Sequence, residues 1–107
     1  MAFYELRRYE IRPGKMESWL KMFAEEILPF QVAKGMVVPA ILRGEEDDSV
    51  FVWIRRFESE AERERLYAAV YEDDRWKNEI SDRVGEHIDR DKIQVLRLSP
   101  TEMSILR

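Results

Sequence analysis

The chain of 107 residues contains no cysteine and only one histidine, His87. Without cysteine it can form no disulfide bridge, no thiolate zinc site and no cysteine nucleophile. A structural metal would have to be bound mainly by carboxylates, because a single imidazole cannot complete a tetrahedral site. We therefore expect neither a metal nor a cofactor.

Long apolar runs are absent as well. No window approaches the length of apolar sequence that a membrane-spanning helix needs, and the first residues lack the basic segment and apolar stretch of an export signal. The 18 basic and 22 acidic residues are interspersed and give a net charge of −4. A surface of mixed charge disfavours nucleic-acid binding. These features predict a cytoplasmic protein that binds neither membrane nor nucleic acid.

What the chain does contain is sufficient for one folded domain over residues 1–107. Hydrophobic residues make up 45% of the sequence, and three of them are tryptophans. A chain of this length and composition can bury a single core without covalent cross-links. No internal repeat or low-complexity segment indicates a second domain.

Apolar periodicity predicts a strand followed by a helix in the first third of the chain. Aromatic and apolar residues alternate with charged ones over 3–12, until a Pro-Gly pair breaks the alternation. From Met16 onward the apolar residues recur with the period of a helix. Pro29 cannot donate a helical hydrogen bond, so we expect the helix to kink or stop near Leu28 and Gly35 to end whatever continues.

Two further strands are predicted in the middle of the chain. The segment 36–44 contains Pro39, which lacks a ladder donor and therefore places this strand at a sheet edge. The segment 50–57 is almost wholly apolar until its arginines and is predicted to be a central strand buried on both faces. The remaining predicted elements are a helix capped by Ser59 and Glu62, a helix that starts at Asp73, a strand over 92–98 and an apolar tail in which we expect Met103, Ile105 or Leu106 to be at least partly buried.

The resulting order, β-α-β-β-α-(α)-β, predicts an α+β fold of the ferredoxin-like, split βαβ type. Its antiparallel sheet would carry the helices on one face and leave the other face open. An open apolar face is rarely tolerated in a soluble monomer. We therefore expect a homodimer through the sheet face, related by two-fold symmetry, with Phe51 or Trp53 in the interface.

Several short motifs along the chain share their order and spacing with one known family. They are Tyr4-Glu5-Leu6-Arg7, Arg12-Pro13-Gly14-Lys15, the segment from Trp53 to Phe57, Ser59 with Ala61-Glu62-Arg63, Trp76 after an Asp-rich turn, and the ending from Leu98 to Ser104. In these motifs the chain resembles the NIPSNAP family over nearly its whole length. Met103 departs from the pattern, because an aromatic residue is typical at that position.

The resemblance implies a dimeric α+β barrel, a fold that cofactor-free monooxygenases and haem-degrading enzymes share, and a family without a settled activity. The favoured function is therefore a small homodimer that binds a small molecule or a partner protein. The alternative is a cofactor-independent oxygenase or isomerase acting on an aromatic or polyketide-like substrate. Haem binding through His87 is a third hypothesis, although its helical position predicts a half-solvated side chain. Tyr67 and Tyr71 share one helical face and are expected to pack in the core or at its flank.

The candidate ligand-binding residues are Glu5, Arg7 and Tyr9 on one strand face, with Trp53 and Arg55 on another. If the two strands are antiparallel neighbours, these side chains would line a cavity with one acid, two guanidinium groups and aromatic walls. Such a cavity suits a small anionic or aromatic ligand. The other interpretation is a structural one, in which Glu5 pairs with Arg7 or Arg55 at the dimer interface because a buried charge requires a partner. The sequence leaves both interpretations open.

Overall fold

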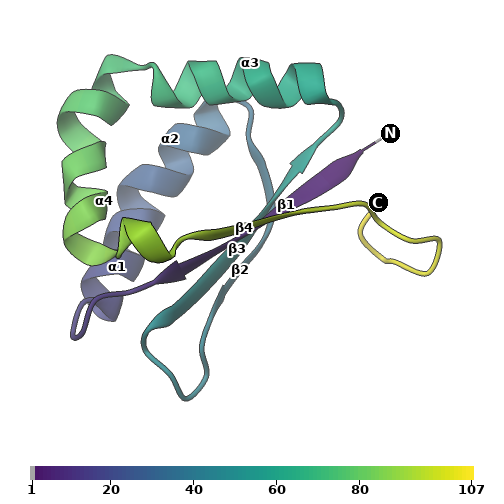
Figure 1. The fold of residues 1–107 in the computed structure, drawn as a ribbon. Helices are drawn as coiled ribbons and strands as arrows, with labels where there is room; N and C mark the ends of the chain where they lie inside the picture. The colour runs from purple at the N-terminus through teal and green to yellow at the C-terminus, as the bar shows by residue number, and fades with distance from the viewer. Residues whose placement is uncertain (1) are drawn as a thin grey trace.

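The computed structural model describes residues 2–107, which form one layer of helices on one antiparallel sheet (Figure 1). The elements in chain order are β1 (Phe3–Glu10), α1 (Met16–Met22), the π-helical turn η1 (Phe23–Ile27), α2 (Leu28–Ala33), β2 (Val37–Arg43), β3 (Val50–Phe57), α3 (Glu60–Tyr71), the π-helical turn η2 (Trp76–Ile80), α4 (Ser81–His87), the 3-10 turn η3 (Arg90–Lys92) and β4 (Gln94–Leu98). The sheet order is β2-β3-β1-β4. This is the predicted ferredoxin-like arrangement, with all helices on one face (Figure 1).

The strand that contains Pro39 lies at the edge of the sheet, as the sequence predicts. β2 pairs only with β3, and the register between them shifts between Val37 and Ala40, on either side of the proline. Because an edge strand pairs on one side only, the missing N–H of Pro39 breaks no second ladder of hydrogen bonds. At the opposite edge lies β4, which pairs with β1.

The first helix is distorted before Pro29 but does not stop there. The Leu28 N–H donates to the Phe23 carbonyl, five residues back, so the chain makes a π-helical turn just before the proline and then continues as α2. Such a turn accommodates a proline because the neighbouring hydrogen bonds shift register. Gly35, with a φ of 110°, ends the helical segment as expected.

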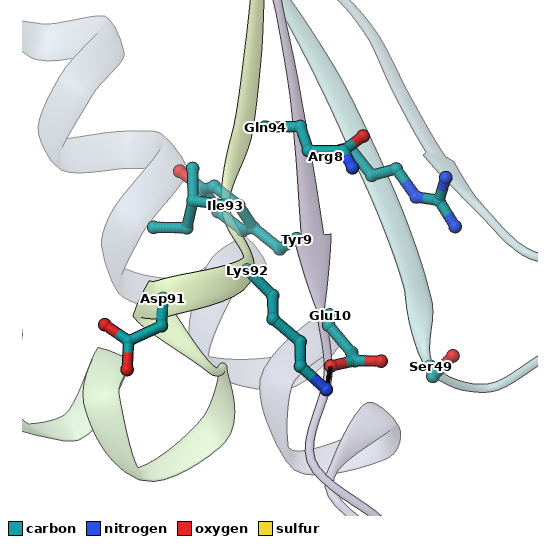
Figure 2. A pocket seen from close by; sticks show the side chains of 8 residues that line it. All are labelled: Arg8, Tyr9, Glu10, Ser49, Asp91, Lys92, Ile93 and Gln94. Atoms are coloured by element: carbon teal, nitrogen blue, oxygen red, sulfur yellow. Dashed lines mark ion pairs between the residues drawn. The ribbon is translucent and has the colours of Figure 1, made fainter.

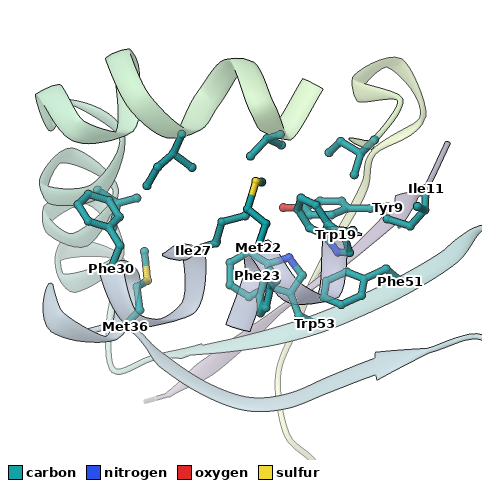
Figure 3. Close-up of a cluster of buried hydrophobic side chains, with 14 of the residues drawn as sticks. Tyr9, Ile11, Trp19, Met22, Phe23, Ile27, Phe30, Met36, Phe51 and Trp53 are labelled. Carbon is teal, nitrogen blue, oxygen red and sulfur yellow. The ribbon is translucent and has the colours of Figure 1, made fainter. Parts of the chain in front are cut away.

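The hydrophobic core lies between the sheet and the helices (Figure 3). Along β3 the side chains alternate between fully and partly buried, so this central strand is buried on the helix side and only half-covered on the other. Phe51 and Trp53 are 0% and 1% exposed within this core, where they pack on Trp19 and Phe23. The expectation that β3 is buried on both faces is therefore wrong for the single chain. Phe51 and Trp53 face the chain's own helices and cannot be interface residues at the sheet face.

The opposite sheet face is apolar and largely uncovered. Register places Leu6 beside Ile54 on β3 and Leu96 on β4, on the side away from the helices. Leu96 is 55% exposed, and Leu42 on the edge strand is 55% exposed. The tail beyond β4 makes a loop that returns to the end of the sheet (Figure 1), where the Arg107 carbonyl accepts a hydrogen bond from Arg56 Nε at 2.7 Å. Only the last of its three apolar residues is partly covered, with Met103 at 90%, Ile105 at 99% and Leu106 at 40% exposure.

The helices of the second half start at the predicted residues. The Ser59 hydroxyl accepts a hydrogen bond from the Glu62 N–H at 3.1 Å, and the Asp73 carboxylate accepts one from the Arg75 N–H at 2.8 Å. Ile80 of η2 and Val84 of α4 are buried. Among residues 2–107, none of these helices has the length and apolar character to cross a membrane.

Candidate functional site

The register between β1 and β3 brings the five predicted site residues to one face of the sheet. Glu5 lies opposite Arg55, Arg7 opposite Trp53, and Tyr9 opposite Phe51. The alternation of a strand then points all of these side chains toward the helices. The sequence correctly predicts that they gather, but they gather beneath the helices and not at the open face where a dimer contact was expected.

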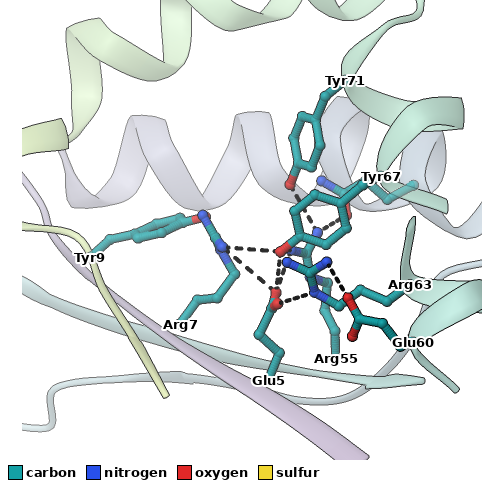
Figure 4. Close-up of polar contacts among 9 residues, drawn as sticks. Glu5, Arg7, Tyr9, Arg55, Glu60, Arg63, Tyr67 and Tyr71 are labelled. Atoms are coloured by element: carbon teal, nitrogen blue, oxygen red, sulfur yellow. Dashed lines mark hydrogen bonds and ion pairs between the residues drawn. The ribbon is translucent and has the colours of Figure 1, made fainter. Parts of the chain in front are cut away.

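Glu5 is the centre of a polar network inside the core (Figure 4). Its carboxylate is buried and accepts hydrogen bonds from Arg55 Nη2 and from the Tyr67 hydroxyl, both at 2.6 Å. Arg63 Nε at 3.4 Å and Arg7 Nη1 at 3.6 Å complete its cationic surroundings. Burial alone would raise the pKa of Glu5, but the charge of Arg55 and the two hydrogen bonds outweigh it, so the pKa lies below its ordinary value. Glu5 is therefore ionised and already compensated.

Arg55 is fully buried, and its two terminal amino groups are fully used. Nη1 donates to Gln31 Oε1 at 3.0 Å and to the Tyr71 hydroxyl at 2.9 Å, while Nη2 donates to Glu5 and to the Tyr67 hydroxyl. The guanidinium also lies 4.7 Å from the Trp53 ring centroid. Its Nε has no hydrogen-bond partner among the described residues. Arg55 is thus a structural cation that holds β3, α2 and α3 together.

Tyr67 links the carboxylate of Glu5 to the guanidinium of Arg55. Its hydroxyl donates to Glu5 and accepts from Arg55 at 2.7 Å. Burial is the main reason that the pKa of Tyr67 rises to about 12; the charge of Arg55 lowers it and the hydrogen bond to Glu5 raises it further. The phenol therefore remains protonated at neutral pH and acts as a neutral bridge.

Arg7 differs from Arg55 because it borders an empty space. Its side chain is 15% exposed, its Nε donates to the Tyr9 hydroxyl at 3.0 Å, and its Nη1 reaches Tyr67 at 3.5 Å. Its Nη2 makes no hydrogen bond within residues 2–107. Arg55 Nε also lacks a partner among the described residues, but Arg55 is not in the cavity lining, so Arg7 is the guanidinium whose unused donor a ligand can reach.

The space beside Arg7 is a cavity of about 270 Å³ between the sheet and the helices. Its walls come from β1, α1, β3, η2 and the segment after α4, and they include Arg7, Tyr9, Trp19, Trp53, Trp76 and Arg90. The indole N–H groups of Trp19 and Trp53 are buried without an acceptor among the described residues. Surrounding atoms cover these two N–H groups, so the cavity combines flat apolar walls with one unused donor, Arg7 Nη2.

A larger hollow of about 400 Å³ lies outside the core, where β4 begins (Figure 2). Most of its lining is charged or polar, and Lys92 pairs there with Glu10 at 2.9 Å. These two side chains are 62% and 42% exposed. We favour the smaller cavity as the binding site, because aromatic rings make up much of its lining and would contact a ligand there.

Three of the five predicted residues line the cavity, and two do not. Arg7, Tyr9 and Trp53 are in its walls, whereas Glu5 and Arg55 lie behind Arg7 as a buried ion pair. The structural interpretation of Glu5 is thus correct in its pairing but wrong in its place, because the pair is inside the core. The ligand interpretation therefore fits Arg7, Tyr9 and Trp53, and the structural interpretation fits Glu5 and Arg55.

The sequence reasoning missed several residues that the fold brings to this group. Tyr67 and Tyr71 were expected only to pack, yet their hydroxyls bind the ion pair. The available signal was their spacing, because two tyrosines on a buried helical face need partners for their hydroxyls. Gln31 and Trp19 come from α2 and α1 and carried no comparable signal.

His87 is buried, which corrects the expectation of a half-solvated side chain. It is 8% exposed, with Nδ1 at 2.7 Å from the Arg83 carbonyl and Nε2 at 2.7 Å from the Ser18 hydroxyl. Since a carbonyl only accepts, Nδ1 donates to it, and in the neutral ring Nε2 accepts from the Ser18 hydroxyl. Both ring nitrogens are occupied, so the geometry does not offer His87 as a haem ligand. Within residues 2–107, no group of three or more acidic or imidazole side chains is placed to hold a metal ion.

The NIPSNAP family model matches residues 4–104. The chain belongs to the NIPSNAP family. A search of curated proteins found no match. The family assignment agrees with the resemblance in the strand and turn motifs near the N-terminus.

Solved structures of other NIPSNAP proteins have the same fold. A NIPSNAP family protein of Agrobacterium tumefaciens has 25% sequence identity and a TM-score of 0.86, with 100% of both chains covered. A second protein of that organism, described as of unknown function, has 22% identity and a TM-score of 0.89 over 99% of this chain and 94% of its own. An uncharacterized NIPSNAP-like domain protein from Burkholderia xenovorans has 18% identity and a TM-score of 0.85 over 96% and 88%.

Proposed function

We propose that this NIPSNAP protein is a cytoplasmic homodimer that binds a small planar molecule in the interior cavity of each chain. The observation that carries the proposal is the cavity beside Arg7, which has aromatic walls and borders a guanidinium whose Nη2 makes no hydrogen bond within residues 2–107. Its volume of about 270 Å³ is near the lower limit of roughly 300 Å³ for small-molecule sites. A compound of one or two fused rings fits that size.

An unused donor beside the cavity supports a bound molecule. Arg7 Nη2 makes no hydrogen bond within residues 2–107, and Arg7 is in the cavity wall. A ligand that carries acceptor atoms would complete the hydrogen bonds of this cation, whereas an apolar filler would not.

The chemistry of the walls favours binding over acid–base catalysis. Among the described residues that line the cavity, none carries a carboxylate or an imidazole. The nearby acid, Glu5, is ionised and held by Arg55 and Tyr67. An oxygenase or isomerase of the alternative kind would need a group that takes a proton from its substrate.

The open sheet face supports the dimer. Exposed apolar residues from the two edge strands lie on that face, among them Leu42 and Leu96 at 55% exposure each, with the half-buried Leu6 and Ile54 on the strands between them. Contiguous apolar surface of this kind is unusual on a monomer, and a two-fold contact between two sheets would cover it with one self-complementary patch. The cavity lies on the other side of the sheet, so dimerisation leaves it in place.

Native mass spectrometry of protein purified from its own host tests the proposal. We expect a dimer that carries an additional small mass, and we expect denaturing conditions to release that mass. Ser81→Phe should reduce the retained mass, because Ser81 lines the cavity and a phenyl ring there would occupy it. Asp82→Phe, at the next and exposed position, is the control and should retain it. A dimer that never retains a small molecule, and whose melting temperature no planar compound raises, would refute the proposal.

A further inference from the structure

The charged walls of the cavity are all cationic. Arg7 and Arg90 are the charged residues among its described lining, and they come from β1 and η3. Arg90 lies across α4 with Nη2 at 2.7 Å from the Ser81 carbonyl, and a side chain at Gly85 would stand 2.6 Å from Arg90 Nη1. Gly85 thus leaves room for the guanidinium at this wall. A cavity lined by two cations and no acid favours an anionic occupant.

The network behind the cavity does not neutralise Arg7. Glu5 is the buried carboxylate there, and it lies 2.6 Å from Arg55 but 3.6 Å from Arg7. Arg55 therefore takes the direct ion pair, and Arg7 is left with the neutral hydroxyls of Tyr9 and Tyr67 as its hydrogen-bond partners. Arg7 thus shares Glu5 at 3.6 Å with the closer Arg55, and two guanidinium groups on one carboxylate leave an excess of positive charge beside the cavity.

Arg7 is also held in an orientation suited to an anion. The bond from Nε to Tyr9 fixes one side of the guanidinium, and only the longer contacts of Nη1 with Tyr67 and Glu5 constrain the other. Nη2 has no partner within residues 2–107. Two amino groups on one edge of a guanidinium match the two oxygens of a carboxylate.

We propose that the ligand of this cavity is a planar aromatic carboxylate whose carboxylate is bound by Arg7. This inference rests on the proposed function and names the class of its ligand. The rings of Trp19, Trp53 and Trp76 form walls for the aromatic part. The carboxylate of the ligand is the counterion of Arg7, as Glu5 is the counterion of Arg55. Arg7 is a specificity-determining residue: it selects an acid over the neutral compound of the same shape.

Calorimetric titration with naphthalene-2-carboxylate and with naphthalene-2-carboxamide tests this inference. The two probes share ring size and shape but differ in charge. We expect the unmodified protein to bind the acid about tenfold or more tightly than the amide, as a charge-assisted hydrogen bond predicts. Arg7→Met should remove this preference, and Arg7→Lys should retain part of it. Arg65→Met removes a guanidinium whose side chain is 67% exposed and should leave the preference unchanged.

The possible outcomes separate the two proposals. Equal binding of acid and amide to the unmodified protein would overturn the carboxylate inference but leave small-molecule binding intact. Binding of neither probe would overturn the carboxylate inference, and the native mass spectrum then decides small-molecule binding by itself. If Arg7→Met proves unfolded by circular dichroism, the comparison between the two probes on unmodified protein and on Arg7→Lys still decides the question.

Discussion

Arg55 carries a full charge at a position that water does not reach. Its stability depends on Glu5, Gln31 and two tyrosine hydroxyls, which come from three other elements of the fold. Removing one partner from such a buried group leaves the other charge uncompensated, and that loss exceeds the net contribution of the intact pair. At the scale of single residues the two arginines therefore differ: Arg55 stabilises the fold, and Arg7 faces the cavity.

The first prediction concerns this difference between the two arginines. Arg55→Met should lower the free energy of unfolding by about 3–5 kcal/mol, because Glu5 would lose its nearest cation. Arg7→Met should cost clearly less, because Glu5 keeps Arg55 at 2.6 Å. Urea denaturation of both variants measures the two losses. Equal losses would show that Arg7 is as much a structural residue as Arg55.

The second prediction is a pH dependence that comes from Glu5. Its pKa in the folded state lies below the ordinary value of 4.5, so its contribution to stability is present above that pH and is lost as the pH falls through the folded pKa. The free energy of unfolding should therefore decrease on acidification below about pH 4.5, and Glu5→Gln should show a shallower decrease. Denaturant titrations at a series of pH values measure both slopes. Identical slopes would contradict the assignment of a depressed pKa to Glu5.

At the scale of the elements, turns and helix ends decide how the site is assembled. The π-helical turn η1 lets one helical segment pass Pro29 and continue to Gln31, which binds Arg55. Had the helix stopped at the proline, Gln31 would not reach the ion pair. The edge position of Pro39 likewise frees β3 to pair with β1, the pairing that brings the site residues together.

The third prediction concerns the glycine that ends this helical segment. Gly35 has a φ of 110°, and a Cβ there would lie 3.2 Å from a methyl group of the buried Leu66. Gly35→Ala should therefore lower the free energy of unfolding by about 1–2 kcal/mol through backbone strain, with an added cost from the contact. Gly14→Ala is the matched control, because Gly14 has a φ of 75° but nothing within 4 Å of the added carbon. Denaturant unfolding should rank Gly35→Ala as the less stable variant, and the reverse order would contradict the packing argument.

At the scale of the whole molecule, the sheet separates two functions. The helix-covered side contains the core, the ion pair and the cavity, and the opposite side presents apolar residues to its surroundings. A second copy that packs on the open side would bury that surface without closing the cavity. The proposed dimer and the proposed ligand site are therefore independent of each other.

The fourth prediction tests the dimer at this scale. Leu96→Glu places a charge on the open sheet face and should convert the dimer to a folded monomer, because burying an unpaired carboxylate in an apolar interface is costly. Val32→Glu is the control: it alters an apolar residue of similar exposure, 51% compared with 55%, on α2. Sedimentation velocity at micromolar concentration should show a dimer for the unmodified protein and for Val32→Glu. A monomer for the unmodified protein would refute the dimer.

The sequence by itself determined the elements and their order. Strand alternation over 3–12, the helical period from Met16 and the lost donor of Pro39 are local properties, and the structure confirms the strand, the helix and the edge position. The sequence also placed Glu5, Arg7 and Tyr9 on one strand face, because side chains alternate in any strand. Local geometry sufficed for these predictions.

Only the tertiary structure decided which side of the sheet those residues occupy and what they meet there. Both faces of β1 and β3 carry apolar residues, so alternation alone could not say which face the helices cover, and Phe51 and Trp53 were assigned to the wrong side. The division of roles between Arg7 and Arg55 depends on Tyr67, Tyr71 and Gln31, which are far away in the sequence. The physical reason is that a charge in the core is defined by its partners, and packing of separate elements, not the sequence near the charge, brings those partners within hydrogen-bonding distance.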